Sequence, residues 1–392
     1  MYNNFDEPVN RHGSHCVKIE RMNDIWHRTD LLPLWVADMD FETPPFIVQA
    51  IRERMLHPVL GYTCPHNGYY QAIIEWVWKR YGLEAQKEHI QFVPGIVPGI
   101  CITLNALTEK GDKIMIQPPV YHPFKQMIEG TGRVVVYNPL LLQEGRYSMN
   151  FSQMREAIKG CKMLILCHPH NPGGTVWEPK ELEILAEICA EHKVIVVSDE
   201  MHADLTLPPH KHLPFAMVNE TAKQLSVTFF SAAKTFNIAG LASSQLFVFN
   251  HQLRKKLFHY IRYNGLDLGN VFGYIAVEAA YRYGEEWLSQ LLTYLQKNID
   301  FLDHWLKSRM PKIKAMIPQA SFLVFLDCRE LGFFSQEQLD DFFVDKAKLA
   351  LNSGAMFGVE GQGFMRINIA VSKVVLEKAL TQLEEAYHKY LI

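Results

Sequence analysis

The sequence predicts an α/β fold in which a mostly parallel central sheet is flanked by helices and joined by a smaller α+β domain. The middle of the chain alternates short apolar runs with amphipathic helical patterns, which is typical of a parallel sheet with helical crossovers. The last third begins with a long helical pattern, about 272–310, and continues with two separate strand patterns. We therefore expect a large domain over 46–280 and a small domain built from 1–45 and 281–392.

Seven apolar runs of the large domain are expected as short buried strands. They cover 91–93, 113–117, 133–137, 162–167, 194–197, 225–230 and 244–249. Between two of them, the stretch 179–192 carries apolar residues at helical spacing. In the small domain we expect strands at 321–327 and 364–369, and a mobile loop at the glycines of 358–363.

Composition excludes several classes of protein. The 392 residues carry a net charge of −3, so there is no basic field for nucleic acid or a membrane surface. The 7 cysteines are scattered and form no C-x-x-C pair, which argues against a zinc ribbon and suits a reducing compartment. The polar N-terminus and the lack of a long apolar run predict a cytoplasmic protein with neither a nucleic-acid nor a membrane partner.

Ligands of open α/β sheets bind beyond the carboxyl ends of the strands, so the residues that follow each strand are the candidates for chemistry. Asp199 follows a buried strand, where it either pairs with a protonated heterocyclic nitrogen or caps a helix. A metal site from Asp199, His202 and Asp204 is a third option, although the spacing fits no compact zinc motif. Lys234 follows another strand and is either a nucleophile or a solvated loop lysine.

Two further turns follow predicted strands. Asn171 lies in the turn His-Pro-His-Asn-Pro-Gly-Gly, whose prolines and glycines hold its side chain in one orientation. The asparagine either bonds a ligand or is an ordinary turn residue. The segment Pro-Gly-Ile-Val-Pro-Gly at 94–99 opens a helix, and its backbone N–H groups are suited to a phosphate. This segment is not a Walker loop, because no G-x-x-x-x-G-K-[ST] pattern is present.

The order of these features resembles the fold-type I pyridoxal 5′-phosphate (PLP) enzymes of the aspartate aminotransferase superfamily. Five segments resemble one branch, the MalY/PatB-type carbon–sulfur lyases, which includes the maltose-regulon modulator and bacterial cystathionine β-lyases. They are LPLWVADMDF (32–41), HPHNPGGTVW (168–177), VSDEMHADL (197–205), SAAKTFNIAG (231–240) and GFMRINIA (363–370). The resemblance covers nearly the whole chain.

The resemblance implies roles for the residues that would hold the cofactor ring. Lys234 resembles the lysine that carries PLP as a Schiff base and then removes the substrate Cα proton. Asp199 resembles the partner of the ring nitrogen, Asn171 the partner of the ring hydroxyl, and Tyr121 the aromatic that stacks on the ring. His202 stands where ordinary aminotransferases usually have tyrosine, and we place it among the cofactor-binding residues.

The phosphate and the substrate have their own implied partners. Backbone N–H groups of Ile96 and Val97 and the hydroxyl of Ser231 would bind the phosphate, and Tyr62 would reach the phosphate of the partner subunit. The remaining implied positions bind substrate, with Arg366 on the α-carboxylate and Trp35 and Ala37 beside it. One departure is Ala242, where many aminotransferases place an arginine against the phosphate.

The resemblance implies a homodimeric PLP enzyme, with no metal, that cleaves cystathionine or related S-substituted L-cysteines into a thiol, pyruvate and ammonia. No single residue forces elimination on physical grounds, so two alternatives remain. One is a class I/II aminotransferase, and the other is a PLP-bound regulator that acts on a transcription factor.

Overall fold

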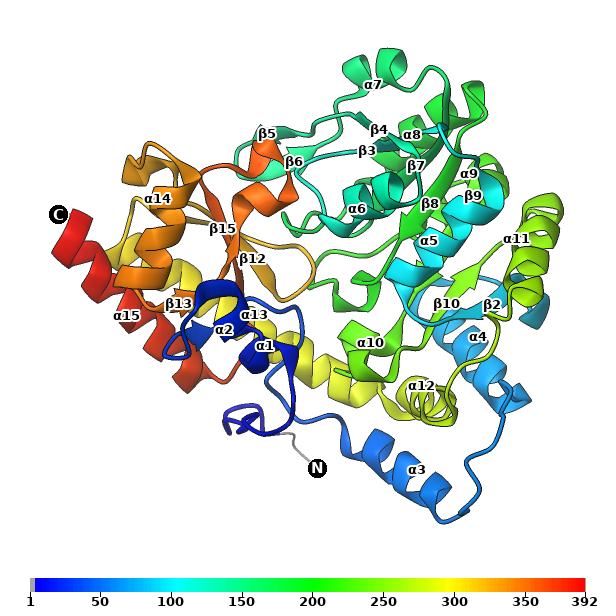
Figure 1. Cartoon of the computed structure of the whole chain (residues 1–392), viewed down its shortest axis with the longest axis horizontal. Coiled ribbons are helices and arrows are strands. Elements are labelled where there is room, and N and C mark those ends of the chain that lie inside the picture. Colours follow the sequence, from blue (N-terminus) through cyan, green and yellow to red (C-terminus); the bar gives the residue numbers. More distant parts are fainter. Residues whose placement is uncertain (1–3, 392) are drawn as a thin grey trace.

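The computed structural model describes residues 4–391, and its centre is a seven-stranded sheet (Figure 1). Strand β10 runs antiparallel to both of its neighbours, and the other pairs are parallel. In sheet order the strands are β2 (Ile90–Val93), β10 (Ser244–Phe247), β9 (Ser226–Phe230), β8 (Ile195–Asp199), β7 (Cys161–Cys167), β3 (Lys113–Ile116) and β4 (Val134–Tyr137). All seven predicted strands are therefore confirmed, with ends shifted by a few residues.

Both faces of this sheet are buried, as the continuous apolar character of its strands requires. Along β7, Met163 and Ile165 belong to one hydrophobic cluster, whereas Leu164 and Leu166 belong to another on the opposite face. Helices α5 and α11 contribute to the first cluster, and α8 contributes to the second. The predicted α/β layering is thus confirmed.

The helices have the following bounds: α1 (Val17–Glu20), α2 (Met22–Trp26), α3 (Pro45–Met55), α4 (Asn67–Tyr81), α5 (Ile96–Leu107), α6 (Pro123–Gly130), α7 (Phe151–Ala157), α8 (Pro179–Glu191), α9 (Glu220–Leu225), α10 (Ala232–Thr235), α11 (His251–Tyr263), α12 (Val271–Tyr283), α13 (Glu285–Arg309), α14 (Gln336–Asp341) and α15 (Lys373–Leu391). Within residues 4–391, no helix combines the length and the apolar character needed to cross a membrane.

The long helical pattern predicted at 272–310 is wrong as a single helix. It is two helices, α12 and α13, that meet at Gly284. A Cβ at Gly284 would lie 2.3 Å from both the Ala280 carbonyl oxygen and the Phe236 ring, so only glycine fits where the two helices join. A glycine within a helical pattern is compatible with either a continuous or a broken helix, which is why the periodicity alone did not reveal the break.

The carboxyl-terminal part carries a four-stranded antiparallel sheet with the order β11 (Lys314–Met316), β12 (Leu323–Asp327), β15 (Phe364–Asn368) and β14 (Asn352–Ser353). Near the N-terminus, β1 (Leu32–Pro33) pairs in parallel with β13 (Leu349–Ala350), so a segment from the first part of the chain lies beside the carboxyl-terminal part (Figure 1). A separate hairpin joins β5 (Leu141–Gln143) and β6 (Arg146–Ser148). The division at residues 46 and 281 stays a prediction.

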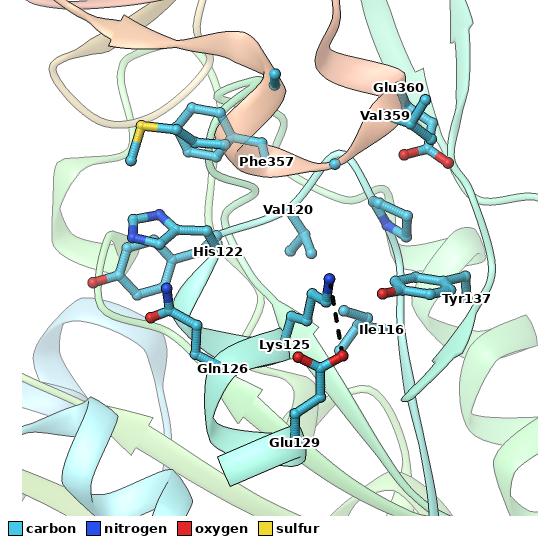
Figure 2. Close-up of a pocket in the computed structure, with 15 residues that line it drawn as sticks. Ile116, Val120, His122, Lys125, Gln126, Glu129, Tyr137, Phe357, Val359 and Glu360 are labelled. Atoms are coloured by element: carbon cyan, nitrogen blue, oxygen red, sulfur yellow. Dashed lines mark ion pairs between the residues drawn. The ribbon is translucent and has the colours of Figure 1, made fainter. Parts of the chain in front are cut away.

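The segment expected as a mobile loop, 358–363, includes a 3₁₀ turn, and its mobility stays a prediction. Two 3₁₀ turns, Gly354–Phe357 and Val359–Gly361, follow one another before β15. Side chains of these two turns face helix α6, which belongs to the part of the chain that contains the seven-stranded sheet (Figure 2).

Candidate active site

The carboxyl ends of the parallel strands meet at one edge of the sheet, and the predicted residues follow them there. Strand β7 leads to Asn171, β8 ends at Asp199, and β9 leads to Ser231 and Lys234. Because β10 is antiparallel to both β2 and β9, β2 runs in the same direction as β9 and delivers the start of α5 to the same edge. The sheet topology thus gathers four segments that are far apart in sequence.

The first turn of α5 presents unpaired backbone amides at this edge. The first intrahelical bonds of a helix leave its leading N–H groups without carbonyl partners, and here these include those of Ile96 and Val97. Gly95, with φ of +113°, makes the turn from β2 into the helix. Gly99 lets α5 approach β9 closely, since a Cβ there would lie 2.5 Å from the ring of Phe229. This geometry fits an anionic group.

Hydroxyl groups cluster beside the start of α10. Ser231 caps α10 by accepting the Ala233 N–H at 3.2 Å, and its Oγ also accepts from the Ser244 hydroxyl at 2.8 Å. The Oγ of Ser243 is buried and interacts with the hydroxyl of Tyr69. Ala242 lies next to Ser243 and has φ of +47°. Because this residue is alanine, the position lacks the cation that many aminotransferases carry there. Neutral hydroxyls and amides therefore form this part of the site.

Asp199 is a buried carboxylate that has no cation in hydrogen-bond contact. Among the described residues, its one recorded side-chain hydrogen bond is the one that it accepts from the Met201 N–H at 3.1 Å, and the charge of Lys234 acts on it without a direct bond. Burial raises the pKa of Asp199 to about 7, despite that hydrogen bond. Its neighbour Glu200 points elsewhere and bonds His212 at 2.6 Å. A buried carboxylate without a cation fits a ligand that brings a positive nitrogen.

Lys234 is half-buried on α10, and its ammonium donates a short hydrogen bond to the carbonyl of Ala37. Burial lowers the pKa of Lys234 to about 8, and the positive charge of Arg366 acts in the same direction, while Asp38 and Asp199 oppose it. A lysine with a pKa in this range supplies neutral amine near physiological pH, which nucleophilic attack on a carbonyl requires. The interpretation as a solvated loop lysine does not fit this environment.

Arg366 on β15 is a buried guanidinium with three oxygen partners. It donates to Asn171 Oδ1 at 3.0 Å, to the Trp35 carbonyl at 3.3 Å and to Asn352 Oδ1 at 2.5 Å. Its Nε has no partner, and the guanidinium carbon lies 4.9 Å from the centre of the Phe357 ring. None of these partners carries a negative charge, so the arginine fits a carboxylate ligand.

Two further predicted residues lie in the same region. Burial lowers the pKa of His202 to about 3, with contributions from the charges of Lys234 and Arg366, and its Nδ1 is buried without a partner. Burial raises the pKa of Tyr121 to about 12, and Asp199 adds to this shift. Charges of Asp199, Lys234 and Arg366 contribute to these pKa shifts, so His202 and Tyr121 lie near those groups.

Trp35 and Ala37 meet the site through their backbone. Their carbonyls accept from Arg366 and Lys234, whereas the Trp35 indole N–H donates to the carbonyl of Lys18 at 3.0 Å. Tyr62 is different, because its side chain is fully exposed and lies in the segment between α3 and α4. Within the described chain, this tyrosine is not part of the cluster.

Three contacts of the site were not found by sequence reasoning. Asn352 and Phe357 both touch Arg366, and Asp204 binds the hydroxyl of Thr235, the neighbour of Lys234, at 3.0 Å. Asp204 also accepts from the Trp76 indole, so it is a structural anchor. Across residues 4–391, no three His, Cys, Asp or Glu side chains gather as metal ligands, so the metal alternative has no support.

The arrangement fits the group that the sequence resemblance implies. An amine of lowered pKa, a buried carboxylate without a cation and a helix start with free amides match the aldehyde, ring nitrogen and phosphate of PLP. The buried Nδ1 of His202, which has no partner among the described residues, is available for a further polar contact.

Comparisons with known proteins give a consistent result. Residues 29–383 match the family described as aminotransferase class I and II. Cystathionine beta-lyase PatB of Bacillus subtilis is 40% identical over 385 residues, which cover 98% of this chain and 99% of that protein. The structure of cystalysin from Treponema denticola, which contains a PLP cofactor, matches with a TM-score of 0.95 and 29% identity over 99% of this chain and 100% of that chain. The PLP-bound C–S lyase from Staphylococcus hominis matches with a TM-score of 0.92 and 33% identity over 98% of each chain.

Proposed function

Because the chain belongs to the aminotransferase class I and II family, in its cystathionine β-lyase branch, we propose that it is a PLP-dependent carbon–sulfur lyase. Its substrates would be cystathionine or related S-substituted L-cysteines, and its products a thiol, pyruvate and ammonia. The observation that carries the PLP-dependent chemistry is Lys234, a lysine of lowered pKa at the sheet edge that interacts electrostatically with the buried carboxylate of Asp199. The choice of carbon–sulfur cleavage over transamination is supported by the likeness to cystathionine β-lyases.

The residues around Lys234 would hold the cofactor. Lys234 attaches it covalently, Asp199 pairs with its ring nitrogen, and the amides of Ile96 and Val97 with the Ser231 hydroxyl bind its phosphate. Asn171 uses Oδ1 for Arg366, so its amide nitrogen remains to donate to the ring hydroxyl. When bound, PLP withdraws electrons from the substrate Cα and so makes the Cα proton acidic.

The protein then selects and moves the proton. Arg366 binds the α-carboxylate and thereby fixes the orientation of the Cα–H bond. Lys234 Nζ would accept the Cα proton as a general base, for which a pKa of about 8 is well matched. The Cβ–S bond breaks with its electron pair on sulfur, and hydrolysis of the remaining three-carbon enamine gives pyruvate and ammonia.

We also propose that two copies of the chain form a homodimer with shared active sites. The supporting observation is the exposure of Tyr62 together with Val59 and Leu60, an apolar stretch that no described part of this chain covers. In this arrangement Tyr62 of one protomer binds the cofactor phosphate of the other.

A test supplies cystathionine to the PLP-loaded protein and measures pyruvate, ammonia and homocysteine. The proposal predicts all three products without any 2-oxo acid. The Lys234→Ala variant should lose both the visible absorption of bound cofactor and at least about 10³-fold in turnover, because the anchor and the base are one group. Lys378→Ala, which removes an exposed lysine on α15, serves as the matched control and should retain both properties. Turnover only with a 2-oxo acid acceptor would instead indicate an aminotransferase.

A further inference from the structure

A buried carboxylate that the proposed chemistry does not use follows Asp199 directly in the sequence. Glu200 is buried and bonds three polar groups: the Ser198 hydroxyl at 2.9 Å, the Phe215 N–H at 2.9 Å and His212 Nε2 at 2.6 Å. The first two are donors, and the third is a donor when His212 carries its proton on Nε2. Donors to both oxygens favour the ionised form of a carboxyl group. We therefore expect Glu200 to carry a second buried negative charge near Asp199.

The groups around Glu200 leave its charge uncancelled. The ring of His212 lies 4.2 Å from the ring of His168, whose Nε2 lies 2.8 Å from a backbone carbonyl oxygen. Burial lowers the pKa of both imidazoles to about 3, so both are neutral near pH 7. The charge of Arg80 also acts on His212, but this arginine forms its ion pair with Asp204 at 3.6 Å. A neutral His212 thus satisfies Glu200 without neutralising it.

Glu200 and Asp199 belong to one rigid segment but point apart. Ser198 and Glu200 bond each other on one side of the extended chain, so Asp199 between them points to the other side. The backbone of both acidic residues is fixed, because the His168 N–H donates to the Asp199 carbonyl at 2.9 Å and the Glu200 N–H donates to the Phe229 carbonyl at 3.0 Å. Burial raises the pKa of Asp199, and the charge of Glu200 raises it further. The two carboxylates therefore interact through space.

We propose that Glu200 is a positioning residue for the cofactor ring: it fixes the segment that presents Asp199, and its negative charge favours a positively charged ring nitrogen there. The inference rests on the proposed pairing of Asp199 with the ring nitrogen of PLP. Two negative charges stabilise a buried cation more than one does, because the surrounding protein screens them less than water would. Glu200 does not touch the cofactor and acts on it only through Asp199 and through its own field.

A binding experiment measures how strongly the apoprotein distinguishes PLP from deaza-PLP, an analogue in which a C–H group replaces the ring nitrogen. Both ligands carry the aldehyde and the phosphate, but only PLP can bring a positive ring nitrogen to Asp199. Isothermal titration calorimetry gives a dissociation constant for each ligand. At pH 8 both carboxyl groups are largely ionised, because burial raises the pKa of Asp199 and that of Glu200 to about 7.

Glu200→Gln removes the charge and keeps the size of the side chain. The new amide can bond the same three partners, with His212 in its other tautomer. The preference for PLP over deaza-PLP should fall about tenfold, because one of the two negative charges near the ring nitrogen is lost. The dissociation constant of deaza-PLP should not change. Glu187→Gln makes the same chemical change at an exposed position on α8 and should alter neither constant.

His212→Phe is the second variant, used if Glu200→Gln does not fold. It leaves one oxygen of Glu200 without its donor, which favours the protonated acid, so the preference should fall about threefold at pH 8. Equal losses for both ligands, or an unchanged preference, would overturn the role of the Glu200 charge. A wild-type protein with no preference would contradict the pairing of Asp199 with the ring nitrogen, and this inference with it. Because no substrate is present, a failure to cleave thioethers would contradict the lyase proposal alone.

Discussion

Lys234 owes its chemistry to neighbours that are distant in sequence. The carbonyl of Ala37, 197 residues away along the chain, accepts its hydrogen bond, and burial lowers its pKa to about 8. Arg366 lies on yet another segment and opposes the charged form of the lysine. A lysine after a strand is most often solvated, so its reactivity is a property of this assembled surrounding.

The lowered pKa of Lys234 predicts the pH dependence of cofactor uptake by the apoprotein. Only the neutral amine attacks the PLP aldehyde, so the rate should fall about tenfold per pH unit below 8 and level off above it. Stopped-flow measurement of the visible absorption from pH 6 to 10 follows this reaction. The control is Nα-acetyl-lysine with free PLP, whose rate should still rise at pH 10. A protein rate that also keeps rising through pH 10 would contradict the lowered pKa.

Site residues that follow strongly apolar strands could be found from the sequence. Site residues that reach the site because two short strands pair with each other were missed. Asp199 and Lys234 follow strong apolar runs, so their place at the sheet edge could be predicted. Asn352 reaches Arg366 because β14 pairs with β15 in the register Asn352–Arg366. Strand β14 has only 2 residues, which is too short to leave a periodic pattern in the sequence.

At the scale of elements, α10 is a helix of 4 residues that cannot be stable by itself. It is fixed at its start by the Ser231 cap and at its end by Thr235, whose hydroxyl donates to Asp204 Oδ2 at 3.0 Å. Asp204 is buried and also accepts from Trp76 and Tyr81 of α4. The short helix that carries Lys234 is thus anchored to a long one.

A double-mutant cycle tests this anchor. Asp204→Asn should lower the free energy of unfolding by about 3 kcal/mol, because the indole and hydroxyl donors lose a charged acceptor. Thr235→Val removes one bond and should cost about 1 kcal/mol. The double variant should lose less than the sum by about 1 kcal/mol, as measured by urea unfolding of the apoprotein. Strictly additive losses would show that the two side chains are not coupled.

Across the whole molecule, the segment that supplies the Trp35 and Ala37 carbonyls is held from both sides. Arg11 and Lys18 form ion pairs with Asp38 at 2.7 Å and 3.0 Å. From β15, the Asn368 amide donates to the carbonyls of residues 36 and 38, each at 2.6 Å. The α/β fold could be predicted from periodicity, but these long-range contacts could not, because they depend on how the chain ends meet.

The shared-site dimer makes a prediction that concerns two chains together. If Tyr62 acts in the partner's site, a dimer of one Lys234→Ala protomer and one Tyr62→Ala protomer has one site that contains both residues. Tyr62→Ala alone should weaken PLP binding about tenfold, through the lost phosphate hydrogen bond. After equal mixing and reassociation, half of the dimers are hybrids with one intact site each, so about a quarter of all sites should be native.

Pyruvate release at limiting PLP measures this recovery. The control pairs Lys234→Ala with Arg366→Ala, since both residues belong to the site of one chain, as their electrostatic coupling indicates. Hybrids of that pair contain no intact site and should recover nothing. A Tyr62 mixture whose activity equals the mean of its two parents would place Tyr62 outside the partner's site. It would leave the exposed stretch around Val59 and Leu60 to another role. Activity that recovers in the Lys234→Ala and Tyr62→Ala mixture, but not in the control mixture, requires an active site built from two copies of the chain. Mixing creates no new residue within either copy.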